Sequence, residues 1–194
     1  MIEFKNLKVQ MLPEILVAKQ YLKKGKIILY PTDTVWGVGC DATNFNAVSK
    51  IYQLKKREES KSLIVLVSSI NMLKKYVFVP KIVIDIIKLS EKPTTIIYNN
   101  PKGFAKNTIA DDGTIAIRIV QDAFCRKLIK RFGKPIVSTS ANISGNETPK
   151  SFKEISKPIL EGVDYIVNLH KNKMNTKSST ILKIDGKDIQ VLRA

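Results

Sequence analysis

Three short groups of polar and basic residues stand just beyond expected strands or helices, where α/β proteins commonly bind their ligands. Residues 30–42 read Tyr-Pro-Thr-Asp-Thr-Val-Trp-Gly-Val-Gly-Cys-Asp-Ala and follow an apolar run. Residues 55–61 read Lys-Lys-Arg-Glu-Glu-Ser-Lys, and residues 138–145 read Ser-Thr-Ser-Ala-Asn-Ile-Ser-Gly. Each group also has an ordinary structural explanation, as a turn, a solvated helix end or a polar loop. No single group therefore identifies a site.

The chemistry that the second and third groups favour is the binding of oxyanions. Lys55, Arg57 and Lys61 repel one another unless they are solvated or meet an anion, and a polyphosphate is a fitting anion. The hydroxyl and amide groups of residues 138–145 can bind phosphate or amino-acid oxygens without a net charge of their own.

Arg118 interrupts the apolar strand that is expected over residues 115–119. An arginine on a largely buried strand requires a partner, and a carboxylate supplies one that accepts two parallel hydrogen bonds. That carboxylate can belong to a substrate or to a structural Asp or Glu of the chain. The sequence leaves both alternatives open.

Familiar catalytic signatures are missing from the sequence. It has no GxxxxGK[ST] phosphate loop, no GxGxxG, no HExxH and no GxSxG. His170 is the only histidine, so a Ser/His or Cys/His nucleophile pair is not expected. Cys40 and Cys125 lie far apart without metal-ligand spacing around them. We therefore expect two reduced, buried thiols and no metal ligands from the protein.

The composition is strongly basic, with 33 Lys and Arg residues against 17 Asp and Glu residues and a formal net charge of +16. Such a charge attracts polyanions such as RNA or nucleotide phosphates, although a lysine-rich solvated surface explains it equally well. A chain of 194 residues, 44% of them apolar, predicts one domain over residues 1–194. No apolar run approaches a membrane span and the start lacks a signal pattern, so we expect a cytoplasmic protein that binds no membrane.

Alternating helical and strand patterns must position these groups. Helices are expected from Pro13 to Gly25, over residues 46–56 and 80–89, from Asp122 to Phe132 before a C′ Gly133, and after the capping box of Ser151 and Glu154. Strands are expected over residues 26–30, 63–67, 94–98, 114–120, 135–138, 164–169, 179–184 and 188–193. The last two should form a hairpin around Asp185 and Gly186. The pattern predicts an α/β fold, a twisted mixed parallel and antiparallel sheet flanked by helices with a C-terminal β-hairpin.

Together the three groups resemble the YrdC/TsaC family over roughly residues 10–194. The most specific matches are Pro-Thr-Asp-Thr-Val-Trp-Gly-Val-Gly at 31–39, Lys-x-Arg at 55–57 followed by Lys-Ser-Leu at 61–63, and Ser-Ala-Asn at 140–142 with Ser-Gly at 144–145. Arg118, Ser179-Thr180 and Arg193 are supporting matches. Trp36 stands where tyrosine or phenylalanine is frequent in the family and preserves an aromatic wall.

The resemblance implies a YrdC-like fold and a nucleotidyltransferase, an L-threonylcarbamoyladenylate (threonylcarbamoyl-AMP) synthase. Members of the family condense L-threonine, bicarbonate and ATP into threonylcarbamoyl-AMP and pyrophosphate, with Mg²⁺ accompanying the ATP. The product serves a downstream threonylcarbamoyl-transferase complex that modifies tRNA to threonylcarbamoyladenosine. Contact of the basic surface with tRNA is a further expectation.

The resemblance also implies the roles of individual residues. Lys55 and Arg57 are expected to be catalytic. The residues expected to bind L-threonine are Thr32, Arg118, Ser138 and Ser179. The residues expected to bind the nucleotide are Lys55, Arg57, Thr114, Ser140, Asn142, Thr148 and Arg193. Glu58 replaces the proline that usually follows Lys-x-Arg in the family. We therefore expect this part of the nucleotide site to be shaped differently, and the resemblance does not assign Glu59 and Lys61 as contacts.

Two other functions fit parts of the same sequence. One is a noncatalytic protein of the same fold that binds tRNA, rRNA or double-stranded RNA, which the net charge favours. Arg118 argues against it, because binding of a phosphate backbone uses surface cations and not an inward-facing arginine. The other is a carbamoyl-adenylating enzyme with a different acceptor, as in the longer hydrogenase-maturation proteins that contain this domain.

Overall fold

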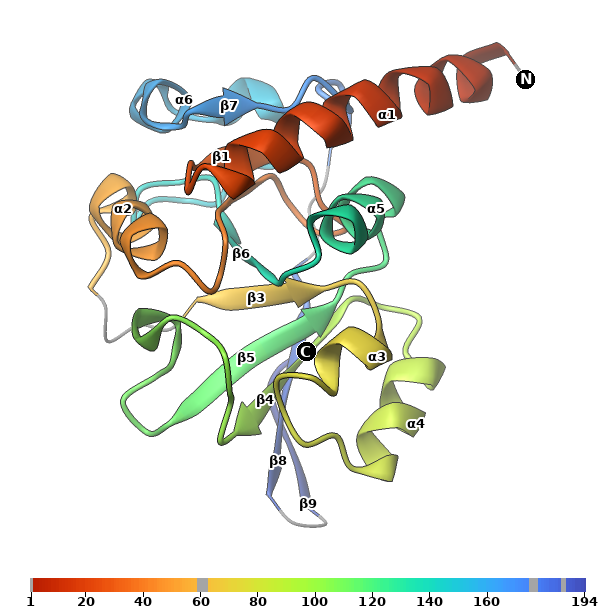
Figure 1. Cartoon of the computed structure of the whole chain (residues 1–194), viewed down its shortest axis with the longest axis vertical. Coiled ribbons are helices and arrows are strands. Elements are labelled where there is room, and N and C mark those ends of the chain that lie inside the picture. Colours follow the sequence, from red (N-terminus) through yellow and green to blue (C-terminus); the bar gives the residue numbers. More distant parts are fainter. Residues whose placement is uncertain (1, 59–62, 175–177, 186–187) are drawn as a thin grey trace.

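The computed structural model describes residues 2–58, 63–174, 178–185 and 188–194 (Figure 1). Its helices are α1 (Ile2–Lys23), α2 (Phe45–Lys55), α3 (Ile70–Leu73), α4 (Lys81–Leu89), α5 (Ala123–Phe132) and α6 (Lys157–Gly162), with 3₁₀ turns η1 (Lys106–Thr108) and η2 (Phe152–Glu154). Its strands are β1 (Ile28–Tyr30), β2 (Gly37–Gly39), β3 (Ile64–Val67), β4 (Thr94–Asn99), β5 (Thr114–Ile119), β6 (Ile136–Ser140), β7 (Tyr165–Ile166), β8 (Thr180–Asp185) and β9 (Asp188–Arg193).

The described strands form one mixed sheet in the order β7-β1-β2-β6-β3-β5-β4-β8-β9. The pairs β1/β7, β3/β5 and β4/β8 are parallel, and the other neighbours are antiparallel. The C-terminal strands β8 and β9 pair as a hairpin. The predicted fold class is therefore confirmed. Of the two residues predicted for the hairpin turn, Asp185 is the last residue of β8 and Gly186 lies outside the described residues.

Helices cover both faces of this sheet. Helices α1 and α5 contact each other and bury their apolar faces against Tyr30, Leu66 and Ile136 (Figure 1). Helices α2, α4 and α6 bury apolar residues in a second core with Val65 and Val137 on the other face. Neighbours along a strand point to opposite faces, so each of β3 and β6 supplies both cores.

Local sequence explains where the helices begin and end. Asn44 and Asp122 cap α2 and α5, because their side chains accept hydrogen bonds from the N–H groups of Ala47 and Cys125. Helix α5 is followed directly by Gly133, whose φ of +85° is a left-handed conformation that favours glycine and stops the helix. These two helices match the predicted ones closely.

Helix α1 begins at Ile2, so the prediction that Pro13 begins this helix is wrong. Proline inside a helix removes one backbone hydrogen bond. The apolar stripe of α1 nevertheless starts before it, with Met11 followed by Ile15, Ala18 and Leu22, all buried. Burial of this stripe against α5 offsets the lost bond.

Two further features differ from their predictions. Strand β2 lies inside residues 30–42, which the sequence predicted only as a loop. The predicted capping box does not form, because Ser151 Oγ lies 2.8 Å from Glu154 Oε1 and caps no backbone N–H; residues 152–154 make the 3₁₀ turn η2, and the expected short helix follows as α6. Cys40 and Cys125 are buried free thiols, as expected. None of the helices in the described part of the chain is long and apolar enough to cross a membrane.

Candidate substrate-binding cavity

A cavity of about 720 Å³ lies beside strands β5 and β6 and is lined by several segments that are distant in sequence. Predicted site residues that line it are Arg57, Arg118, Ser138, Ser140, Thr148, Ser179 and Arg193. Its walls also include Thr34, Val35, Trp36, Gly37, Glu147 and Lys150. The predicted site residues Thr32, Lys55, Thr114 and Asn142 do not line it. All three polar groups of the sequence thus contribute to one hollow.

A turn at Thr32 shapes one wall of the cavity. The hydroxyl of Thr32 donates to the carbonyl of Val35 at 2.6 Å and accepts from the N–H of Thr34 at 3.0 Å. Thr32 itself is buried, and the turn instead presents Thr34 and Val35 to the cavity. Its hydroxyl therefore orders the wall, and direct contact with a substrate stays a prediction.

Strand β2 continues this wall because two glycines let it approach its neighbours. A Cβ on Gly37 would lie 2.9 Å from Ser138 Oγ, and a Cβ on Gly39 would lie 2.2 Å from the carbonyl oxygen of Val137. The first contact is with a side chain in the cavity, and the second is with the backbone of β6. Gly37 thus keeps the space around the Ser138 hydroxyl open.

Trp36 forms an apolar part of the wall. Its ring is buried and packs against Phe152, with ring centroids 5.0 Å apart. The aromatic wall inferred from the resemblance is therefore present, although Phe152 carried no sequence signal as its partner.

Arg118 enters the cavity from β5 and is held by a carboxylate of the chain. Its Nη2 lies 2.9 Å from Asp33 Oδ1 and 3.3 Å from the hydroxyl oxygen of Thr34. The sequence had left a structural carboxylate and a substrate carboxylate as alternatives, and Asp33 is the structural one. Among the described residues the buried Nε of Arg118 has no hydrogen-bond partner. Asp33 and Thr34 therefore do not use every donor of the guanidinium.

Arg193 approaches from the last strand and is held by Ser179. Its Nε donates to the Ser179 carbonyl at 2.9 Å, and its Nη2 donates to the Ser179 hydroxyl at 3.1 Å. The same hydroxyl lies 2.9 Å from that of Thr95. Burial and the nearby positive charge of Arg118 lower the pKa of Arg193. Two guanidinium groups therefore face one cavity, and an anion bound between them would relieve their repulsion.

Lys55 is buried beneath the third polar group. Its ammonium group donates to the carbonyl of Ser140 at 2.5 Å and to the carbonyl of Asn142. Burial, with a smaller contribution from the charge of Arg57, lowers the pKa of Lys55 to about 8. Lys55 thus holds residues 140–142 in place from below, and its predicted contact with the nucleotide stays a prediction.

The remaining predicted residues are held by local hydrogen bonds. The Thr114 hydroxyl donates to Asp112 Oδ1 at 2.6 Å, away from the cavity lining. The amide of Asn142 donates to the carbonyls of Ile143 and Asn146, which closes the loop after β6. Glu59 and Lys61 lie outside the described residues.

Sequence reasoning missed several residues of the lining. Glu147 and Lys150 follow the Ser-Gly end of the third group, so proximity to that motif was an available signal. Asp33 lies inside the first group, where it was interpreted as a turn residue. Its pairing with Arg118 joins segments 85 residues apart, and no sequence spacing indicates this.

The fold and the cavity together define an α/β protein that binds oxyanionic ligands with arginine, hydroxyl and backbone groups. Comparison with known proteins gives the family. Residues 20–194 match the model of the Sua5/YciO/YrdC family, whose description is "Telomere recombination". The chain belongs to the Sua5/YciO/YrdC family.

Named relatives and solved structures agree with this. A putative threonylcarbamoyl-AMP synthase of Methanocaldococcus jannaschii is 38% identical over 90% of this chain and 84% of its own length. The threonylcarbamoyl-AMP synthase of Pseudoalteromonas translucida is 38% identical over 82% of this chain and 87% of its own. A crystal structure of P. abyssi Sua5 complexed with L-threonine superposes with a TM-score of 0.83 and 26% identity. That alignment covers 92% of this chain and 53% of the Sua5 chain, so this chain spans about half of Sua5.

Proposed function

We propose that this protein is a threonylcarbamoyl-AMP synthase, a nucleotidyltransferase that condenses L-threonine, bicarbonate and ATP and releases pyrophosphate. The observation that carries the proposal is the convergence of Arg118 and Arg193 on one cavity with the hydroxyls of Ser138 and Ser140. The names of the relatives and the family membership favour this enzyme over a noncatalytic RNA-binding protein.

L-Threonine is proposed to bind at the Arg118 end of the cavity. Its carboxylate would take donors of the Arg118 guanidinium, whose position Asp33 sets. Ser138 and Ser179 flank this end and would bind the polar groups of threonine, with Thr32 supporting the wall. The nucleotide would occupy the part lined by Arg57, Ser140, Thr148 and Arg193, with Lys55 and Asn142 fixing the loop beneath it.

The proposed reaction needs positioning and charge neutralisation more than a protein nucleophile. The threonine amine combines with bicarbonate to form a carbamate, with loss of water. A carbamate oxygen then attacks the α-phosphorus of ATP, and the bond from that phosphorus to the bridging oxygen breaks to release pyrophosphate. Binding both substrates in one cavity removes much of the entropic barrier, and Arg57 and Arg193 would stabilise charge on the phosphates.

Mg²⁺ is proposed to accompany the ATP. Among the described residues no group of three His, Cys, Asp or Glu side chains could hold a metal ion. Mg²⁺ commonly keeps several waters and binds through substrate phosphates with one or two carboxylates, and Glu147 is a carboxylate in the cavity lining. The cavity therefore fits a metal that enters with the nucleotide, where it would neutralise phosphate charge.

The downstream partner is proposed to be a threonylcarbamoyl-transferase complex that uses the adenylate to modify tRNA, with both steps in the cytoplasm. The adenylate is a mixed anhydride, which water hydrolyses, so rapid transfer to such a complex would protect it.

Pyrophosphate release tests the proposal. The purified protein is incubated with ATP and Mg²⁺, and with threonine and bicarbonate singly and together. Release that requires both supports the synthase, and the adenylate should appear in equal amount by mass spectrometry. Release that is indifferent to threonine, or no release alongside tight salt-sensitive RNA binding, would contradict it.

A further inference from the structure

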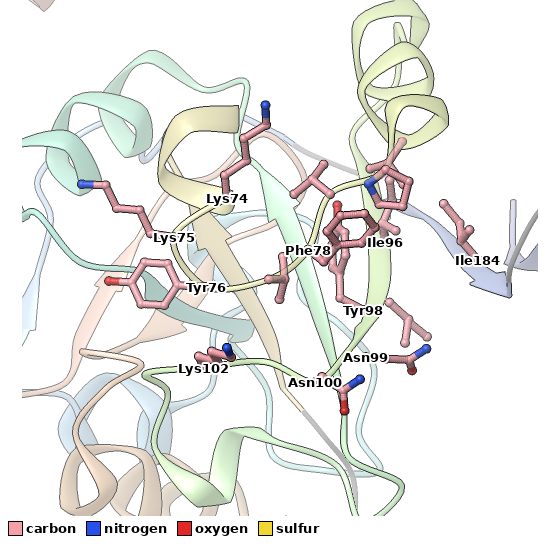
Figure 2. Close-up of a pocket in the computed structure, with 15 residues that line it drawn as sticks. Lys74, Lys75, Tyr76, Phe78, Ile96, Tyr98, Asn99, Asn100, Lys102 and Ile184 are labelled. Carbon is pink, nitrogen blue, oxygen red and sulfur yellow. The ribbon is translucent and has the colours of Figure 1, made fainter.

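Figure 2 shows a second and larger cavity, of about 970 Å³. It lies on the other face of the sheet from the substrate-binding cavity, as the alternation of side chains along β4 shows. On β4, Ile96 and Tyr98 line it and belong to the core beneath α2 and α4. Thr95 alternates with them and pairs with Arg118, on the face of the first cavity. We call this second cavity the Phe78 pocket; besides Ile96 and Tyr98 its lining includes residues 74–80, 99, 100 and 102.

The centre of the Phe78 pocket is lined by aromatic and apolar side chains, and the Phe78 ring is largely exposed to solvent. Phe78 is 83% exposed, although a phenylalanine ring normally gains free energy by burial. The other two rings are engaged, because Tyr98 is buried and Tyr76 packs against Phe104 with ring centroids 4.9 Å apart. Phe78 is thus the lining ring that can stack on a flat ligand.

The rim of the pocket carries positive charge and amide groups. Lys74 and Lys75 follow α3, Asn99 ends β4, and Asn100 and Lys102 come after it (Figure 2). All five are exposed, and the described lining contains no carboxylate. The nearby carboxylate of Asp41 is already paired with Lys134 at 2.9 Å. The lysine and amide groups around Phe78 therefore favour a negatively charged ligand.

The backbone holds these two rim segments in a fixed relation. The N–H of Lys102 donates to the carbonyl of Tyr76 at 2.8 Å. Gly103, with a φ of +76°, turns the chain beside the Tyr76 ring. This contact holds Lys102 beside the segment that carries Lys74, Lys75 and Phe78.

We propose that the Phe78 pocket binds single-stranded RNA, with one unpaired base stacked on Phe78 and flanking phosphates near Lys74, Lys75 and Lys102. An exposed aromatic ring among cations is the arrangement with which proteins bind single strands, because every base offers a π-face and every linkage a charge. A duplex would not fit, since its bases are already stacked. The proposal does not depend on the proposed synthase activity, and RNA bound here would leave the substrate-binding cavity on the opposite face free.

Fluorescence anisotropy with a labelled single-stranded RNA of about 12 nucleotides tests the stacking contact. Phe78→Ala should weaken binding by about 10-fold, within the range expected for loss of one stacked base, and Phe78→Trp should retain it. Leu89→Ala is the matched control, because Leu89 is a similarly exposed apolar residue, 82% exposed, outside the pocket. Equal binding by Phe78→Ala and the wild-type protein would overturn the proposal.

Salt dependence tests the phosphate contacts. The triple variant Lys74→Ala, Lys75→Ala, Lys102→Ala should reduce the slope of log affinity against log salt by about 2, as expected for three contacts with a single strand. Its control is Lys127→Ala, Lys130→Ala, Arg131→Ala on α5, which removes the same charge elsewhere. Equal losses in both triple variants would show a diffuse charge effect and overturn the proposal.

Two competitors define the ligand, and a separate assay reports on the other cavity. A duplex RNA of equal length that competes as well as the single strand would overturn the proposal, as would AMP that competes as well at equal phosphate concentration. Pyrophosphate release by Phe78→Ala should equal that of the wild-type protein. Loss of RNA binding with unchanged release separates this proposal from the proposed function.

Discussion

Asp33 and Arg118 form an ion pair with 2.9 Å between Oδ1 and Nη2, and their side chains are only 8% and 4% exposed. The other carboxylate oxygen of Asp33 accepts from the N–H of Gln121 at 2.9 Å. One carboxylate therefore links the turn after β1 to the end of β5 and fixes the arginine that faces the cavity.

Asp33→Asn should destabilise the protein and weaken threonine binding together. The substitution leaves the buried guanidinium of Arg118 without a negative partner, which should lower the free energy of unfolding by about 3 kcal/mol. Urea denaturation measures this change. Glu161→Gln is the control, because its pair with Lys157 on the surface of α6 is exposed and should contribute less than about 0.5 kcal/mol. Similar losses in both variants would contradict the structural role of Asp33.

The lowered pKa of Lys55 should make stability depend on pH. The folded-state pKa of about 8 lies below the ordinary value of 10.5, so the folded protein holds fewer protons than the unfolded chain between these two values. The free energy of unfolding should therefore rise with pH across this window, by roughly 3 kcal/mol at most. The gain is complete above about pH 10.5 and is lost as the pH falls through about 8.

Comparison with Lys55→Met isolates this effect, since methionine fills similar space without titrating. Denaturation curves of the wild-type protein and the variant are measured at several pH values, and their difference is plotted. The difference should shift in favour of the wild-type protein as pH rises. A difference that stays constant between pH 7.5 and 10 would exclude titration of Lys55 in this window.

Gly37→Ala and Gly39→Ala should have different consequences although both lie on β2. The first places a methyl group against the Ser138 hydroxyl, so the proposed KM for threonine should rise about 10-fold with a modest loss of stability. The second places a methyl group 2.2 Å from the Val137 carbonyl oxygen, so strands β2 and β6 must separate. Thermal melting and threonine-dependent pyrophosphate release distinguish them. Equal melting temperatures for the two variants would contradict this explanation.

Arg118 and Arg193 should affect different substrates. Arg118→Lys keeps a positive charge beside Asp33 but loses the planar fork, so it should raise the KM for threonine by roughly 10- to 100-fold. Arg193→Lys should mainly raise the KM for ATP. Steady-state kinetics with each substrate varied in turn provides the measurement. If both variants raised the KM for ATP and left the KM for threonine unchanged, Arg118 would not belong to the proposed threonine site.

Much of the fold could be predicted because its signals are local. The helix at residues 123–132 has an apolar stripe, an Asp122 cap and a terminal Gly133, so its limits depend on neighbours in sequence. Strand β2 was missed because two of its three residues are glycines, which have low strand propensity. Packing against Tyr30 and Val137 decides its conformation. The prediction of a single domain over residues 1–194 stays a prediction.

The candidate site was predictable as a set of segments but not as a set of contacts. Motif resemblance identified the family, which the family model confirms. It did not indicate that Lys55 lies under the loop at residues 140–142, facing backbone carbonyls, while Arg57 lines the cavity. Lys55 and Arg57 flank the C-terminal end of α2, and packing determines which of them is buried.

The amino-acid sequence by itself determined the fold class, the family and the segments that form the cavity, because hydrophobic periodicity, caps and motif residues act over a few neighbours. Only the tertiary structure decided which carboxylate holds Arg118, which side chains reach the cavity and where Phe78 is exposed. Those relationships join residues far apart in the chain, and they arise from the order and register of strands that no local pattern encodes.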